Sequence, residues 1–183
     1  HGLIDKLGRI LVRLGSADRS TSVKVAQESP EPLPVLRSAP VGIRLDEWGA
    51  LGVVGPHDGL HDVVRSVLVQ CAAWHGPDEL RIAVLAPGCT DLAWMRWLPH
   101  VDPGDGGPLS VAWHPADVDP LLEWLNAIVQ QRRQQLGNAS LPEVLVVVAD
   151  AGVLAVRPGL RTLLDEGPAV GIRFLCIDSA EQR

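Results

Sequence analysis

The sequence has few cysteines, no long apolar run and no excess of positive charge. Its 183 residues include 3 cysteines, which share no spacing typical of a metal site, so we expect reduced thiols and no bound metal. No segment reaches the ~18 consecutive apolar residues that a membrane-spanning helix requires. The formal net charge of −6 argues against binding to nucleic acid or to an anionic membrane. We therefore expect protein partners, no cofactor and no direct insertion of this chain into a membrane.

The composition indicates one globular unit that belongs to something larger. Hydrophobic residues make up 46% of the chain and charged residues 21%, which is enough for a single well-buried core. The chain shows no secretory signal and begins at His1 rather than at a methionine. We therefore expect a piece of a longer protein.

From Val41 onward, apolar patterning predicts alternating strands and helices. The runs at 144–148 and 172–177 are continuously apolar, which is typical of strands buried on both faces. This alternation predicts an α/β fold with a parallel sheet and helices on both of its faces. The expected strands are 51–54, 80–85, 109–112, 144–148 and 172–177. The expected helices are 63 to about 74, 91–97, 118 to about 135, and 160–165.

The first forty residues follow a different pattern. Segments 10–14 and 21–26 alternate apolar and polar residues around the polar stretch 15–20, which predicts an N-terminal β-hairpin. An amphipathic helix through Leu3 to Leu14 competes for the same residues, but the β-branched second segment and the polar turn favour the hairpin. Prolines between positions 29 and 40 predict an extended connector. The expected division is therefore 1–40 for the hairpin and connector, and 41–183 for the α/β core.

The octet Gly-Pro-His-Asp-Gly-Leu-His-Asp at 55–62 stands where P-loop ATPases carry their phosphate-binding loop. Counting from Gly55, Leu60 replaces the second glycine, His61 replaces the lysine and Asp62 replaces the magnesium-binding hydroxyl. A leucine side chain obstructs the close approach of backbone to phosphate that glycine permits. A carboxylate at the start of a helix repels an anion that the helix dipole would otherwise attract. We expect a loop that can neither bind nor hydrolyse nucleotide.

The second landmark of P-loop ATPases is only half present. In these enzymes an apolar strand ends in an aspartate that helps to hold magnesium, and many carry a glutamate next to it as the base. Here the strand at 144–148 leads to Asp150, but Ala151 follows. Asp150 alone is weak evidence, because an aspartate after a strand is as often a turn or cap residue.

The same region allows a metal-dependent hydrolase as an alternative. His57 and His61 are four residues apart, a spacing that places two imidazoles on one face of a helix, and Asp150 is the candidate third ligand. Against this, we expect His57 to precede the helix. The competing interpretation of the metal site is a polar loop that fills the vacated phosphate pocket. For the octet as a whole it is an ordinary strand-to-helix turn, with Asp58 or Gly59 near the helix cap.

Two surface interpretations involve larger side chains. Trp94 and Trp97, three residues apart, can share one face of a short helix that Leu98 extends. They form a candidate docking surface, since tryptophan is enriched at interfaces, or they cover the core. Arg132 and Arg133 lie at the polar end of a helix, where we expect solvated surface.

Several of these segments resemble the FtsK/SpoIIIE superfamily, and within it the EccC/EssC motor proteins of type VII secretion. The most specific is Trp-Met-Arg-Trp-Leu-Pro-His at 94–100, which follows the expected strand at 80–85, as a similar stretch does in modules of these motors. Further similar segments are Gln70, 74–80 and 167–172. The resemblance implies a three-layer P-loop NTPase fold of the RecA/FtsK type, with the hairpin added at its N-terminus.

The resemblance also implies a role. Active modules of the family carry an intact phosphate loop and an acidic pair, whereas this chain has Leu60, His61, Asp62 and Ala151. It therefore resembles a degenerate, non-catalytic module, whose partners would be neighbouring ATPase modules of the same chain and subunits of the secretion membrane complex. Such a module would lie at the cytoplasmic face of the plasma membrane, as part of a membrane-anchored protein. The alternative is a functional ATP-binding module with an atypical loop, completed by an arginine from a neighbour.

Overall fold

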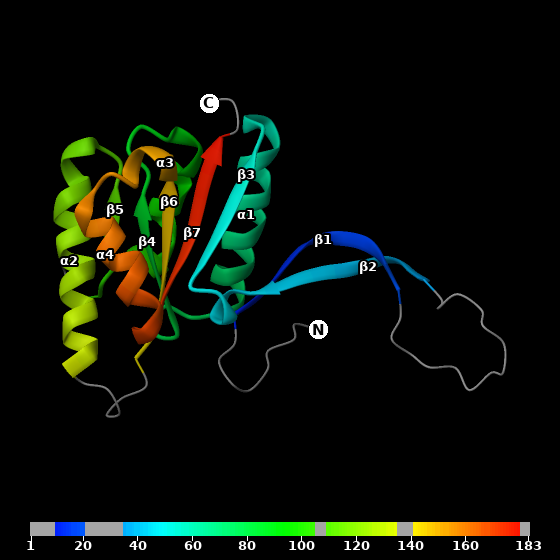
Figure 1. Ribbon diagram of the computed structural model, residues 1–183, viewed down its shortest axis with the longest axis horizontal. Coiled ribbons are helices and arrows are strands. Elements are labelled where there is room, and N and C mark those ends of the chain that lie inside the picture. Colours follow the sequence, from blue (N-terminus) through cyan, green and yellow to red (C-terminus); the bar gives the residue numbers. More distant parts are fainter. Residues whose placement is uncertain (1–9, 21–34, 105–108, 135–140, 180–183) are drawn as a thin grey trace.

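The computed structural model describes residues 10–20, 35–104, 109–134 and 141–179. Its centre is a five-stranded parallel sheet with the strand order β3-β7-β6-β4-β5, shown in Figure 1. The strands are β3 (Ala50–Gly55), β4 (Leu80–Leu85), β5 (Val111–Ala112), β6 (Glu143–Ala149) and β7 (Ile172–Ser179). The predicted α/β class with a parallel sheet is confirmed.

Helices cover both faces of this sheet. The α1 helix and the 3-10 helices η2 and η3 pack on one face, and α2, α3 and α4 pack on the other. Side chains alternate accordingly along the central strands: Val147 and Leu175 contribute to the first core, whereas Val146 and Phe174 contribute to the second. The covering elements are α1 (His57–Trp74), η2 (Thr90–Trp97), η3 (Pro99–Val101), α2 (Pro115–Gln134), α3 (Ala151–Leu154), α4 (Pro158–Glu166) and η4 (Gly167–Val170).

An N-terminal antiparallel hairpin is present, as predicted, but its arms differ from the expected ones. Strand β1 (Leu11–Ser20) pairs with β2 (Val35–Arg44). The stretch 15–20, predicted as the turn, is therefore strand, and the competing helix is wrong over residues 11–14. The predicted second arm at 21–26 lies outside the described residues. Pro40 stands inside β2, which a two-stranded ribbon tolerates because one edge of each strand makes no ladder hydrogen bonds.

The hairpin is fixed to the sheet at its base and extends away from the β3 side of the molecule (Figure 1). Ile10 and Val12 are buried in the core that α1 covers. The side chain of Gln70 on α1 accepts a hydrogen bond from the Arg13 N–H at 2.8 Å and donates one to the Arg13 carbonyl at 2.9 Å. An α1 side chain thus takes the hydrogen-bonding role of a neighbouring strand.

The shorter elements depart most from the prediction. The helix expected at 91–97 is the 3-10 helix η2, and the strand expected at 109–112 is reduced to β5. The four-residue α3 was not predicted, because one turn is too short to show helical periodicity. Within the described ranges, no helix combines the length and the apolar character needed to cross a membrane.

Candidate functional site

The carboxyl ends of β4, β6 and β7 meet beside the start of α1, which is the usual position of ligand sites in open α/β sheets. A cavity of about 550 Å³ lies there. Its walls come from the first turns of α1, from the loop that follows β4, and from the residues at the ends of β6 and β7. The lining residues are Leu60, His61, Pro87, Gly88, Cys89, Thr90, Asp91, Ala149, Asp150, Ile177 and Ser179.

The junction between β3 and α1 differs from the predicted loop. Helix α1 begins at His57, so that Pro56 alone separates it from β3. The prediction that His57 precedes the helix is wrong. The carbonyl of Pro56 already accepts the N–H of Leu60 at 3.2 Å. Since aspartate and glycine are both tolerated in a first helical turn, the polar octet gave a false loop signal.

Three replaced positions of the phosphate loop have distinct environments. Leu60 is 4% exposed and belongs to the core under α1. His61 faces the cavity with 15% of its side chain exposed, and its Nε2 lies 3.5 Å from Asp91 Oδ2. Asp62 is exposed and pairs with Arg65 at 3.4 Å. Gly55, the last residue of β3, pairs with Ser179 of β7.

Asp150 lines the same cavity as Leu60 and His61, so the structure brings these predicted positions together. It follows β6 in the left-handed conformation, with φ of 53°, which aspartate tolerates better than most residues. Its carbonyl accepts the N–H groups of Val153 and Leu154 at the start of α3.

Cys89 is a cavity residue that the sequence did not single out. Partial burial raises the pKa of its thiol, and the carboxylates of Asp91 and Asp150 raise it further, while backbone hydrogen bonds from Leu92 and Asp91 oppose the rise. In the described part of the chain, His61, Cys89 and Asp91 each place one potential ligand atom within 4.8 Å of the others. The sequence could not reveal this group, because His61 lies on another element. The side chain of His57, the other predicted ligand, lies outside what the structure describes.

The tryptophan pair is divided between core and solvent. Trp97 is 82% exposed, whereas Trp94 and Leu98 are partly buried against the core under α1. Met95, between the tryptophans, is fully buried. Trp97 is therefore the member of the candidate surface that solvent reaches most freely.

His100, the last residue of the same motif, is buried, and its Nε2 lies 2.7 Å from the His75 carbonyl at the end of α1. The segment at 94–100 thus fastens η2 and η3 to the end of that helix. The burial of Met95 and His100 accounts for these two positions of the segment without a bound ligand.

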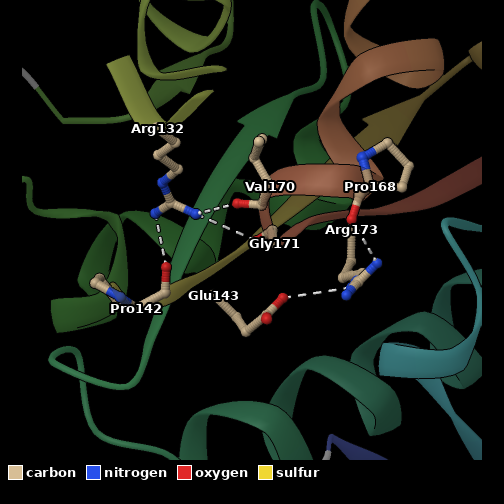
Figure 2. Close-up of polar contacts among 7 residues, drawn as sticks. All are labelled: Arg132, Pro142, Glu143, Pro168, Val170, Gly171 and Arg173. Atoms are coloured by element: carbon tan, nitrogen blue, oxygen red, sulfur yellow. Dashed lines mark hydrogen bonds and ion pairs between the residues drawn. The ribbon is translucent and has the colours of Figure 1, made fainter. Parts of the chain in front are cut away.

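Arg132 contradicts the prediction of a solvated helix end. It is only 9% exposed, and Figure 2 shows its guanidinium directed at backbone carbonyls from two loops. It donates to Val170 at 2.9 Å, to Gly171 at 3.4 Å and to Pro142 at 2.7 Å. Burial lowers the pKa of Arg132, and the negative charge of Glu143 opposes this shift only in part. These contacts hold the amino ends of β6 and β7, away from the cavity.

The sheet order, the covering layers and the position of the cavity define an open parallel α/β domain. No protein-family model matches the chain. Among curated relatives, the ESX-3 secretion system protein EccC3 of Mycobacterium tuberculosis is 32% identical over 117 residues, which are 61% of this chain and 9% of the relative.

Solved structures show the same similarity at the level of the fold. Thermomonospora curvata EccC (ATPases 2 and 3), in complex with a signal sequence peptide, matches with a TM-score of 0.68 at 15% identity, over 95% of this chain and 30% of that chain. The cytoplasmic domain of EssC matches with a TM-score of 0.66 at 16% identity, over 92% of this chain and 33% of that chain.

The predicted resemblance is confirmed. Homologues of this chain are EccC secretion proteins, and its structural neighbours are cytoplasmic ATPase domains of EccC and EssC. The matched part of the chain spans 9% of the length of the EccC3 relative.

Proposed function

We propose that this chain is a non-catalytic, ATPase-like interaction module of a type VII protein secretion motor. Its curated relatives are named as ESX secretion system proteins, and its fold matches that of a protein named as a type VII secretion ATPase, EccC. The observation that supports the absence of catalysis is that α1 begins at His57, directly after Pro56. A phosphate loop must extend around the anion before its helix begins, and one intervening residue leaves no length for that.

The side chains near this junction support the same conclusion. Leu60 fills core where a working loop has glycine, and His61 is turned toward Asp91 rather than carrying a lysine's fixed charge. Asp150 retains the position of a magnesium-binding carboxylate, but Ala151 supplies no base for water. The chain therefore lacks the groups that usually bind the phosphates, neutralise their charge and activate water.

Nucleotide titration tests this proposal. We expect the isolated chain to bind neither ATP nor ADP, with or without magnesium, more tightly than about 100 μM, which corresponds to roughly 5 kcal/mol. Isothermal calorimetry measures it, with an intact ATPase module from an EccC relative as the positive control. Tighter binding would establish the alternative, a functional ATP-binding module with an atypical loop, for which the 550 Å³ cavity provides the space.

The interaction role is assigned to the surface around Trp97, with Trp94 and Leu98 supporting it from the core side. The partners are the neighbouring ATPase modules and subunits of the secretion membrane complex, at the cytoplasmic face of the plasma membrane. A buried aromatic anchor typically contributes about 2 kcal/mol or more to association. Trp97→Ala should therefore weaken binding to separately produced ATPase modules of the same motor by roughly thirtyfold. Unchanged affinity would move the interaction to another surface.

A further inference from the structure

We propose that the cavity at the carboxyl edge of the sheet binds a zinc ion through His61, Cys89 and Asp91. The imidazole comes from the second turn of α1, the thiol from the loop between β4 and η2, and the carboxylate from the first turn of η2. The three ligand atoms lie within 4.8 Å of one another. Among the three ligands, only His61 belongs to the octet at 55–62. The zinc site does not rest on the proposed function.

The distances suit a small tetrahedral ion. Zinc bonds to nitrogen, oxygen and sulfur of about 2.0 to 2.3 Å place neighbouring ligand atoms roughly 3.3 to 3.8 Å apart. His61 Nε2 and Asp91 Oδ2 are already separated by 3.5 Å. The sulfur of Cys89 lies within 4.8 Å of both atoms, so it has to approach them by no more than about 1.5 Å.

Cys89 is held in a turn immediately before η2. The Cys89 N–H donates to the Ala86 carbonyl at 3.1 Å, which closes the turn. A zinc dication favours the thiolate form of a cysteine that it binds.

The ligand set selects the class of metal. Mixed nitrogen, sulfur and carboxylate donors suit zinc, whereas magnesium and calcium require oxygen ligands. With three protein ligands, the fourth position faces the cavity, across which Asp150 lies. Zinc would join the start of α1 to the loop after β4, at the end of the sheet where related ATPases place an anion.

Metal titration of the untagged, chelator-treated 183-residue chain tests the proposal. We expect one zinc ion per chain, bound more tightly than about 1 μM in calorimetry. Cobalt(II) in place of zinc should produce an intense thiolate-to-cobalt absorption band. Wild-type protein that binds zinc more weakly than about 1 μM, or that lacks the cobalt band, overturns the proposal whether or not any variant folds.

Matched variants assign the ligands. Cys89→Ser and His61→Gln should each weaken zinc binding at least tenfold, and Cys89→Ser should abolish the cobalt band. Cys176→Ser and His114→Gln remove a thiol and an imidazole away from the cavity and should leave both readouts unchanged. Equal losses in these controls would reveal adventitious binding and overturn the assignment. ATP titration and zinc titration can fail separately, since neither outcome determines the other.

Discussion

Trp94 and Trp97 lie three residues apart, and the fold gives them different surroundings. Trp94 packs against the core under α1, whereas Trp97 is 82% exposed. Trp94→Ala should lower the free energy of unfolding by about 3 kcal/mol, because it leaves a void beside the core. Trp97→Ala should change it by no more than about 0.5 kcal/mol. Urea denaturation of both variants measures the difference, and equal destabilisation would contradict this division.

Arg132 and Arg133 are adjacent on α2 but make contacts of different kinds. Arg132 donates to three partly buried backbone carbonyls, while Arg133 forms an exposed ion pair with Glu166 at 2.5 Å. Arg132→Met should destabilise the fold by about 3 kcal/mol, since it leaves those carbonyls without their charged donor. The matched Arg133→Met should cost less than about 1 kcal/mol, as exposed ion pairs contribute little. Chemical denaturation compares them; similar losses would mean that the carbonyls find other donors.

The hairpin depends on α1 for its attachment. Beyond the buried Ile10 and Val12, Gln70 is the polar link, with hydrogen bonds to both backbone groups of Arg13. Gln70→Ala should speed hydrogen exchange of the Arg13 amide roughly tenfold, the equivalent of about 1.4 kcal/mol. Gln131→Ala, on the exposed side of α2, is the control. Exchange that stays at the wild-type rate in Gln70→Ala would show that apolar contacts alone hold the hairpin.

The junction of β3 and α1 shows how one element boundary changes the interpretation of a site. Glycines, aspartates and a proline together indicate a loop, and the sequence pattern of 55–62 contains all three. In the structure the helix includes six of these residues, because Pro56 can precede a first turn and Leu60 packs into the core. Packing therefore decides where α1 begins. The position of that start decides how much backbone remains to surround a phosphate.

The buried thiol of Cys71 makes the stability of the whole molecule depend on pH. Burial raises the pKa of Cys71 from the ordinary 9.0 to about 12. Below pH 9 the thiol is protonated in both states; as pH rises from 9 toward 12, only the unfolded chain loses this proton, so the folded state is progressively disfavoured. Between about pH 8 and about pH 10.5, the wild type should lose roughly 2 kcal/mol more stability than Cys71→Ala.

Urea unfolding of both proteins at several pH values measures this difference in slope. The alanine variant can be less stable throughout, since it lacks the sulfur's packing, without affecting the comparison. Parallel curves for the two proteins would show that Cys71 is not shielded from solvent as the structure indicates.

Much of the architecture was predictable because its signals are local. The apolar runs that became β6 and β7, and the run that became β4, mark strands buried on both faces. The hairpin was predictable in kind but not in its pairing, since alternation marks a strand without naming its partner. The candidate site was predictable in part: Leu60, His61 and Asp150 do meet at one cavity, but Cys89 and Asp91 carried no signal of their own.

The sequence by itself determined the α/β class and the resemblance to EccC and EssC, because each depends on residue types at short spacing. Only the tertiary structure decided that α1 begins at His57, that Arg132 is buried, and that His61 lies beside Cys89 and Asp91. These features depend on contacts between segments far apart in the chain, and burial against a distant partner overrides what a residue's neighbours in sequence suggest.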